Sequence, residues 1–177
     1  MTLTNKQSGY SLLEVMIAVV ILSIGLAALG LLQVGNVQNS YNSHNRSLAA
    51  TSAQNMGERL RSNLLGYANG EFINASLGIL GTCSTSNSTE ACTPEQLAQD
   101  DLARWQAELE QVLPEGAGVV CLDDGVVDDG TPDAPACSGT GNTVVKVFWR
   151  ESASFSTQIT TDDIDNAWQA FGLVVYP

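Results

Sequence analysis

One apolar run near the N-terminus constrains the fold more than any other feature of this 177-residue chain. From Leu12 to Leu32 the run has Glu14 as its only charged residue and contains no proline. A helix of that length is about what the ~30 Å hydrocarbon core of a bilayer requires. We therefore expect a helix that inserts into a membrane.

Two other structures are common for so apolar a segment. A cleavable secretory signal is disfavoured because Lys6 is the only cation before the run and no small-x-small cleavage site follows it. A buried core helix is disfavoured because a chain of this length rarely encloses a helix that is apolar on every side. Membrane insertion is the better prediction.

Glu14 needs a partner or access to water, because a carboxylate just inside a bilayer costs at least ~2.5 kcal/mol on insertion scales. One hypothesis leaves Glu14 hydrated at the level of the lipid headgroups. A second follows from the residues upstream, since a cut between Gly9 and Tyr10 would create an α-amino group one helical turn before Glu14. An amine and a carboxylate at that spacing can neutralise each other within one chain or between neighbouring chains.

The segment Gly9-Tyr10-Ser11-Leu12-Leu13-Glu14 and the apolar run after it resemble the class III signal of type IV pilins and type II secretion pseudopilins. In that family a prepilin peptidase cuts after the glycine and methylates the new N-terminal residue. The resemblance implies that Gly9 ends a leader, that Tyr10 becomes the methylated N-terminus and that Glu14 is the acid used in assembly. Tyr10 stands where phenylalanine is usual, and because both are aromatic we expect processing to survive.

The charge balance limits the partners of the chain, which has seven Lys and Arg against 19 Asp and Glu and a net charge of −12. It argues against nucleic acid, because phosphate binding needs a basic surface. It also argues against docking of the soluble part on anionic lipid headgroups. A soluble surface kept from aggregating by self-repulsion explains it best, and the length allows one domain besides the helix.

The cysteines show neither a CxxC pair nor a nearby histidine, since the single histidine is His44, so zinc spacing is absent. The chain has four cysteines. An even number of cysteines in a part of a protein that lies outside the cytoplasm predicts two disulfides, for which three connectivities are possible. We favour the two pairs that each close a short polar loop, at on the order of 3 kcal/mol each. These pairs are Cys83–Cys92 and Cys121–Cys137.

An apolar stripe of helical period and the absence of proline before Pro94 predict one long helix from Ser11 to about Leu64. A second helix is predicted by Thr93-Pro94-Glu95-Gln96, with threonine as N-cap, proline at N1 and glutamine at N3. The stripe consists of Ala49, Ala53, Met56, Leu60 and Leu64. The buried face of the second helix is expected to be Leu97, Leu102, Trp105, Leu109 and Val112, and its solvated side Asp100, Asp101, Glu108 and Glu110.

Three strands are expected, at 119–122, 144–150 and 170–176, and the second alternates Val145, Val147 and Trp149 with Lys146, Phe148 and Arg150. Strands that pack on the stripe of a long helix make an α+β fold, with a small antiparallel sheet, a second helix and disulfide-bounded loops.

An aspartate-rich loop lies between Cys121 and Cys137. Clustered carboxylates in a turn-rich loop are the ligands of calcium, but their spacing here does not match an EF-hand. A solvated surface loop is the stronger prediction, and no cofactor is expected. The weak calcium candidates are Asp123, Asp124, Asp128 and Asp129.

Within the pilin class, Ser23-Ile24-Gly25-Leu26 and the segments 120–123, 135–137 and 147–151 resemble the PilV minor pilins, the type IV pilus modification proteins. The resemblance implies a leader of residues 1–9, a membrane and filament-core helix of 10–35 and a periplasmic globular part of 36–177. It implies a protein that primes pilus assembly at the filament tip and helps present a tip adhesin. Its partners would be the prepilin peptidase, the major and other minor pilins and the inner-membrane assembly platform.

Two alternatives differ in function. A minor pseudopilin of type II secretion shares the N-terminal signal, but the cysteine loops and the C-terminal half favour the pilus. A membrane-tethered periplasmic enzyme is disfavoured because the sequence has one histidine, no nucleophile elbow, no phosphate loop and no metal spacing. We expect no enzymatic activity.

Overall fold

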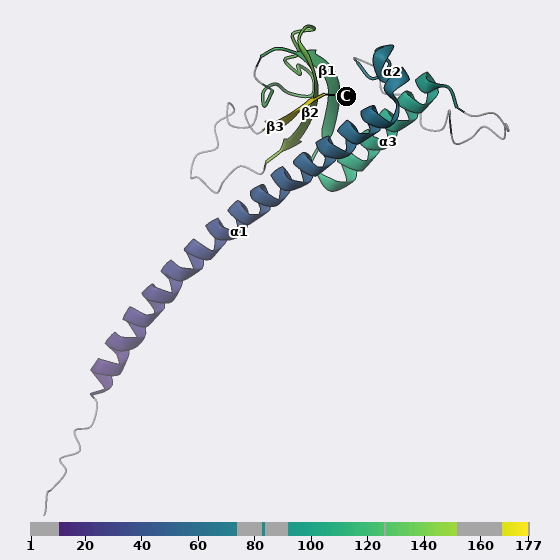
Figure 1. The fold of residues 1–177 in the computed structure, drawn as a ribbon. Coiled ribbons are helices and arrows are strands. Elements are labelled where there is room, and N and C mark those ends of the chain that lie inside the picture. Colours follow the sequence, from purple (N-terminus) through teal and green to yellow (C-terminus); the bar gives the residue numbers. More distant parts are fainter. Residues whose placement is uncertain (1–10, 74–82, 84–91, 126, 152–167, 177) are drawn as a thin grey trace, which may run out of the picture. The chain divides into compact units, whose positions relative to one another are not determined.

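The computed structural model describes residues 11–73, 83, 92–125, 127–151 and 168–176 (Figure 1). The chain forms two compact units, residues 1–40 and residues 41–177, and we call the second unit the head. A long helix, further helices and a small antiparallel sheet confirm the predicted α+β fold. The elements are α1 (Leu12–Ser62), α2 (Leu64–Ala68), α3 (Pro94–Val112), β1 (Ala117–Asp123), β2 (Asn142–Arg150) and β3 (Trp168–Val175).

The single helix α1 confirms the expected long helix, and it ends just before Asn63. The side-chain oxygen of Asn63 accepts a hydrogen bond from the Gly66 N–H at 3.1 Å and so caps α2. The side-chain amide of Asn63 donates to the Pro94 carbonyl at 2.7 Å. One asparagine therefore ends α1, begins α2 and connects both to the first turn of α3.

The capping box predicted for α3 is confirmed. The Thr93 hydroxyl accepts from the Gln96 N–H at 3.2 Å, and the Gln96 side chain accepts from the Thr93 N–H at 3.0 Å. The predicted buried face is right at Leu102, Trp105 and Leu109 and wrong at both ends, because the buried stripe begins at Ala98 and follows the helical period from there. The two residues of the predicted buried face that are exposed are Leu97 and Val112.

The acidic side of α3 is less solvated than expected. Asp100 is buried and accepts a hydrogen bond from Arg104 at 2.7 Å, so its placement on the solvated side was wrong. Arg59 of α1 lies 3.5 Å from Asp101 and 2.9 Å from Glu108. These arginine contacts stabilise carboxylates that burial would otherwise disfavour.

The sheet has the order β1-β2-β3, with both pairs antiparallel. One face packs on the head part of α1 and on α3, and the predicted stripe residues Ala49, Ala53, Met56 and Leu60 lie in that core. Leu64 is exposed, contrary to the prediction, because it belongs to α2. The sheet contributes Val120, Val145, Val147, Trp149 and Val175 to the same core.

The central strand β2 is buried on both faces, from Thr143 to Trp149. Although Lys146 and Phe148 alternate with the core-facing valines and tryptophan, they are 0% and 1% exposed. The reason is the 124–141 loop, which returns over the second face and contacts it through Ala136 and the Cys121–Cys137 disulfide. The loop makes a third layer that the strand pattern does not show.

Candidate functional site

The N-terminal part of α1 is apolar on all sides. Residues Leu12–Gly30 have a mean hydropathy of 2.7 and none of them is buried in the structure. Large apolar side chains are exposed on every side of the helix, for example Leu12 at 79% and Ile24 at 67%. By length and composition this segment can cross a membrane.

Glu14 lies in the first turn of this helix, where it is exposed. Its backbone N–H donates to the Ser11 carbonyl at 2.9 Å, and a carboxylate near a helix N-terminus interacts favourably with the helix dipole. Gly9 and Tyr10 lie outside the described residues, so the cleavage and methylation sites stay predictions.

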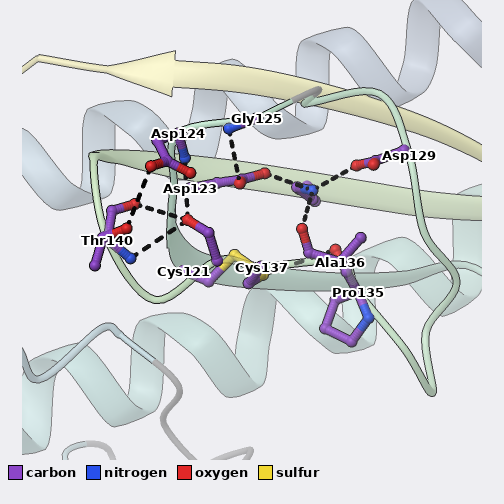
Figure 2. Close-up of a disulfide and its surroundings, with 11 residues drawn as sticks. Cys121, Asp123, Asp124, Gly125, Asp129, Pro135, Ala136, Cys137 and Thr140 are labelled. Carbon is purple, nitrogen blue, oxygen red and sulfur yellow. Dashed lines mark hydrogen bonds and ion pairs between the residues drawn. A yellow bond between two sulfur atoms is a disulfide. The ribbon is translucent and has the colours of Figure 1, made fainter.

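Two disulfides lie in the head. The structure joins Cys83 to Cys92 and Cys121 to Cys137. The second connects β1 to the far end of the aspartate-rich loop and holds that loop against the sheet (Figure 2). The interior of the loop closed by Cys83 and Cys92 lies outside the described residues.

A buried ammonium group lies beneath the aspartate-rich loop. Lys146 Nζ is 2.8 Å from Asp123 Oδ2, 2.8 Å from Asp129 Oδ1 and 3.1 Å from the Ala136 carbonyl oxygen. The side chains of Lys146 and Asp123 are 0% and 2% exposed, whereas Asp129 reaches the surface. We call Lys146 and these three oxygen atoms the lysine clasp, and Figure 2 labels the three residues that supply the oxygen atoms, Asp123, Asp129 and Ala136.

The clasp shifts the pKa values of both buried partners in the direction that keeps them charged. The hydrogen bond from Lys146 lowers the pKa of Asp123, and the Gly125 N–H lowers it further. Burial alone would lower the pKa of Lys146, but its hydrogen bonds to Asp123 and Asp129 together raise that pKa. Both shifts therefore favour the charged forms of Asp123 and Lys146.

Acid is expected to remove the contribution of Asp123 to stability. Because the folded pKa of Asp123 is below its ordinary value of 3.8, that contribution is complete above about pH 4 and disappears as the pH falls through the folded pKa. Thermal unfolding of the full chain and of Asp123→Asn should give a constant difference in midpoint from pH 8 to about pH 4. Below that pH the difference should shrink. Asp124→Asn, at an exposed neighbour, is the control, and a difference that persists undiminished at pH 2 would contradict this assignment.

The four calcium candidates do not converge on one point. Asp123 and Asp129 bind Lys146. The Asp124 carboxylate accepts from the Thr140 hydroxyl at 3.4 Å. Asp128 accepts from the Gly172 N–H at 2.7 Å and lies 3.5 Å from Arg46. The part of the chain that the structure describes contains no group of three or more His, Cys, Asp or Glu placed to hold a metal.

Lys146 is a buried charged residue that the sequence prediction missed. The available signal was a single lysine within an otherwise apolar strand, Val144–Trp149, with aspartates in a loop tied to the neighbouring strand by Cys121. A buried lysine requires acidic partners, so this combination favours an internal ion pair.

A hollow of about 260 Å³ lies between α3 and β1. Its described walls are mostly apolar, with Phe72, Trp105, Pro132 and Phe148 among them, and contain no titratable side chain. General acid–base or nucleophilic catalysis needs such a group within reach of the substrate. The hollow offers no catalytic chemistry among the described residues.

The comparisons with known proteins concern the N-terminal region. Residues 4–30 match the family described as the prokaryotic N-terminal methylation motif. No curated protein and no solved structure matches the chain. The motif covers Glu14 and the apolar segment of α1, and it implies processing by a prepilin peptidase and assembly with other pilins. Together with the apolar helix and the α+β head, it supports a type IV pilin-like or pseudopilin-like, structural protein.

Proposed function

We propose that this protein is a minor pilin of a type IV pilus. The observation that carries the proposal is the methylation motif at residues 4–30, continued by the apolar segment Leu12–Gly30. In this role the prepilin peptidase cuts after Gly9 and methylates Tyr10. The helix anchors the chain in the inner membrane with the head in the periplasm, until the assembly platform transfers it to the filament.

Glu14 makes the transfer from the membrane to the filament energetically favourable. In the bilayer its carboxylate lacks a partner, which costs at least ~2.5 kcal/mol. In the filament the methylated α-amine of a neighbouring subunit supplies the opposite charge, so incorporation relieves that cost. The same contact sets the register between subunits while their apolar helices bundle.

The charges of the head support a minor rather than a major subunit. Of the chain's 19 acidic residues all but Glu14 lie in the head, and of its seven Lys and Arg residues all but Lys6 do. Every one of these head cations lies in an ion pair with an acid of the same head. The pairs are Arg46–Asp128, Arg59–Asp101 and Glu108, Arg61–Glu58, Arg104–Asp100, Lys146–Asp123 and Asp129, and Arg150–Glu115.

A filament built from many copies of this head would therefore place surplus carboxylates beside one another, with no uncommitted cation to bridge them. Like charges at such contacts are costly, so neighbours of different charge are favoured. This fits a subunit present in few copies among other pilins, as at a filament tip. The resemblance to PilV minor pilins adds the role of priming assembly and presenting an adhesin.

A minor pseudopilin of type II secretion is the second candidate, because the methylation motif is common to both classes. The two candidates differ in their final location, because a pseudopilin stays within the cell envelope whereas a pilin reaches the cell surface.

Mass spectrometry of filaments sheared from the cell surface, compared with the inner-membrane fraction, tests both candidates. A methylated peptide beginning at Tyr10, present in the sheared filaments at low abundance, is the expected result. The same peptide confined to the membrane fraction would favour the pseudopilin. An intact leader in every fraction would overturn both, and Gly9→Leu, which should keep its leader, provides the uncut reference.

A further inference from the structure

The edge of β1 that does not pair with β2 has an open stretch between two occupied ends. At one end the Gln106 side chain donates to the Gly116 carbonyl at 3.3 Å and accepts from the Gly118 N–H at 3.0 Å. At the other end the Leu122 carbonyl accepts from the Gly139 N–H at 3.0 Å. A side-chain amide and a loop therefore make hydrogen bonds that a neighbouring strand would otherwise make.

These contacts identify the backbone groups of β1 that face away from β2. In an antiparallel pair, residues whose N–H and C=O point to the partner strand alternate with residues whose groups point outward. Gly118 and Leu122 point outward, so Val120 between them does the same. Within the described part of the chain, the Gly118 carbonyl, both backbone groups of Val120 and the Leu122 N–H make no hydrogen bond at this edge. They form the pattern that an added strand requires.

The apolar hollow of about 260 Å³ lies along the same stretch, because residues 117–120 line it. Its walls come from both faces of the sheet. Trp105 packs with Val120 in the core on one face. Pro132 and Phe148 lie on the face that the 124–141 loop covers. Because the side chains of a strand alternate between the two faces, an added strand can place apolar side chains against both walls.

The opposite edge of the sheet, at β3, is occupied at its centre. The Gly172 N–H donates to the Asp128 side chain at 2.7 Å. The backbone of Val127 lies so close to Gly172 that a Cβ there would collide with it. In the described sheet, an unpaired stretch beside a hollow is therefore a property of β1.

Exposed carboxylates lie near both ends of the open stretch. Glu110 accepts from Gln106 Nε2 at 3.2 Å beside one end, and Asp124 directly follows β1 at the other. Neither belongs to the described ion pairs, in which every Lys and Arg of the head already pairs with another acid. A strand with Lys or Arg at its ends complements this charge, whereas a second copy of the acidic head does not.

We propose that the open stretch of β1 binds an extended segment of another protein, which adds a strand to the sheet, places apolar side chains in the hollow and carries Lys or Arg at its ends. Backbone hydrogen bonds give such a complex its affinity, and pockets for the side chains give it specificity. The proposal concerns the head alone, so it holds for a pilin and for a pseudopilin.

Hydrogen–deuterium exchange of the full-length chain in detergent micelles, resolved to single amides, tests the proposal. In the chain alone, the outward amides of Val120 and Leu122 should exchange at least tenfold faster than those of Val119 and Cys121, which bond to β2. The probe is the peptide acetyl-Lys-Lys-Val-Thr-Val-Lys-Lys-amide. A saturating concentration of this peptide should slow the two outward amides at least tenfold and leave the other two unchanged.

Two peptides and two variants serve as controls. The same peptide with its central amides N-methylated keeps its side chains but cannot donate their hydrogen bonds, so it should protect nothing. A peptide with Glu in place of Lys should protect less, because Glu110 and Asp124 repel it. Leu122→Pro removes an outward N–H, a change that an edge strand tolerates, and should abolish the protection of Val120. Leu122→Ala keeps the N–H and should retain that protection.

Four results would overturn the proposal. Slow exchange of Val120 and Leu122 in the chain alone, at every concentration, would show that the chain itself covers this edge. Slow exchange that appears only at high chain concentration would assign the edge to a second copy. No protection by the unmodified peptide, or equal protection by the N-methylated one, would show that β1 does not pair with an added strand. The peptide comparison uses the unmodified chain, so it decides the question even if Leu122→Pro fails to fold.

Discussion

A chain carrying Glu14→Ala is expected to be cut and methylated normally but to remain in the inner membrane, with at least a tenfold loss from sheared filaments. The leader and cut site, Gly9 and Tyr10, are unchanged in this variant, so the peptidase has its substrate. What is lost is the charge that meets the neighbouring α-amine. Quantitative mass spectrometry of the peptide beginning at Tyr10, in filament and membrane fractions, measures both steps.

The expected magnitude follows from the cost of the unpaired charge. A carboxylate without a partner in lipid is disfavoured by at least ~2.5 kcal/mol, and each 1.4 kcal/mol corresponds to about a factor of ten. Alanine has no such cost in the membrane, so the variant no longer gains free energy on entering the filament. The apolar contacts of α1 remain, but lipid tails provide equivalent contacts and do not favour assembly.

Two matched variants separate the charge from other effects. Glu14→Gln keeps the size and the hydrogen-bonding oxygen but not the charge, so it should behave as Glu14→Ala does. Glu58→Ala removes a highly exposed carboxylate of the head, whose ion-pair partner is Arg61, and should assemble normally. Normal incorporation of Glu14→Ala would refute the pairing role, and failure of its cleavage would assign Glu14 to recognition by the peptidase instead.

Features encoded by local sequence were predictable. The capping box of α3 depends on Thr93, Pro94 and Gln96, which are adjacent, so their geometry needs no tertiary contact. The length of α1 follows from the absence of proline and from its apolar stripe. The strands were found at the right places, but each begins two residues earlier in the structure, because antiparallel pairing extends them beyond their apolar cores, and β3 ends at Val175, one residue before the predicted end.

Features that depend on tertiary packing were not predictable. The alternation in β2 indicates two faces, but it does not show that the 124–141 loop covers the second face and buries Lys146. Similarly, Asp100 was placed on a solvated side because its sequence neighbourhood does not reveal how closely α3 packs. In both cases the residue is charged and buried, and its partner is decided by the fold.

The residues described in the candidate site also fall into a predictable and an unpredictable group. The sequence predicted Glu14 and the apolar helix because their chemistry depends on composition and spacing along one segment. The lysine clasp combines residues 123, 129, 136 and 146 from a strand end, a loop and a second strand. Only the register between β1 and β2 brings these elements together.

Trp105→Ala is expected to destabilise the head more than any single surface change. The Trp105 indole is 1% exposed, and its Nε1–H donates to the Ser52 carbonyl of α1 at 3.0 Å. Its ring lies directly against Gly118 of β1. Removing a buried tryptophan side chain costs ~3–5 kcal/mol, which lowers the unfolding midpoint by roughly 10 °C in a chain of this size. Trp168→Ala is the control, because that ring is partly exposed and its contact with Arg150, 5.0 Å from the guanidinium carbon to the ring centre, contributes ~1 kcal/mol.

Substitution of Gly118 tests whether the loss of stability in Trp105→Ala comes from the close packing of α3 on β1. A Cβ at position 118 would overlap the six-membered ring of Trp105, so Gly118→Ala alone should also lower the midpoint. In the Trp105→Ala background the two nearest atoms are gone, and the next, at the end of the Leu109 side chain, can rotate away. Gly118→Ala should then cost little, and the double variant should be no less stable than Trp105→Ala. Additive losses would show instead that the two residues act independently, since neighbours in direct contact couple and distant residues do not.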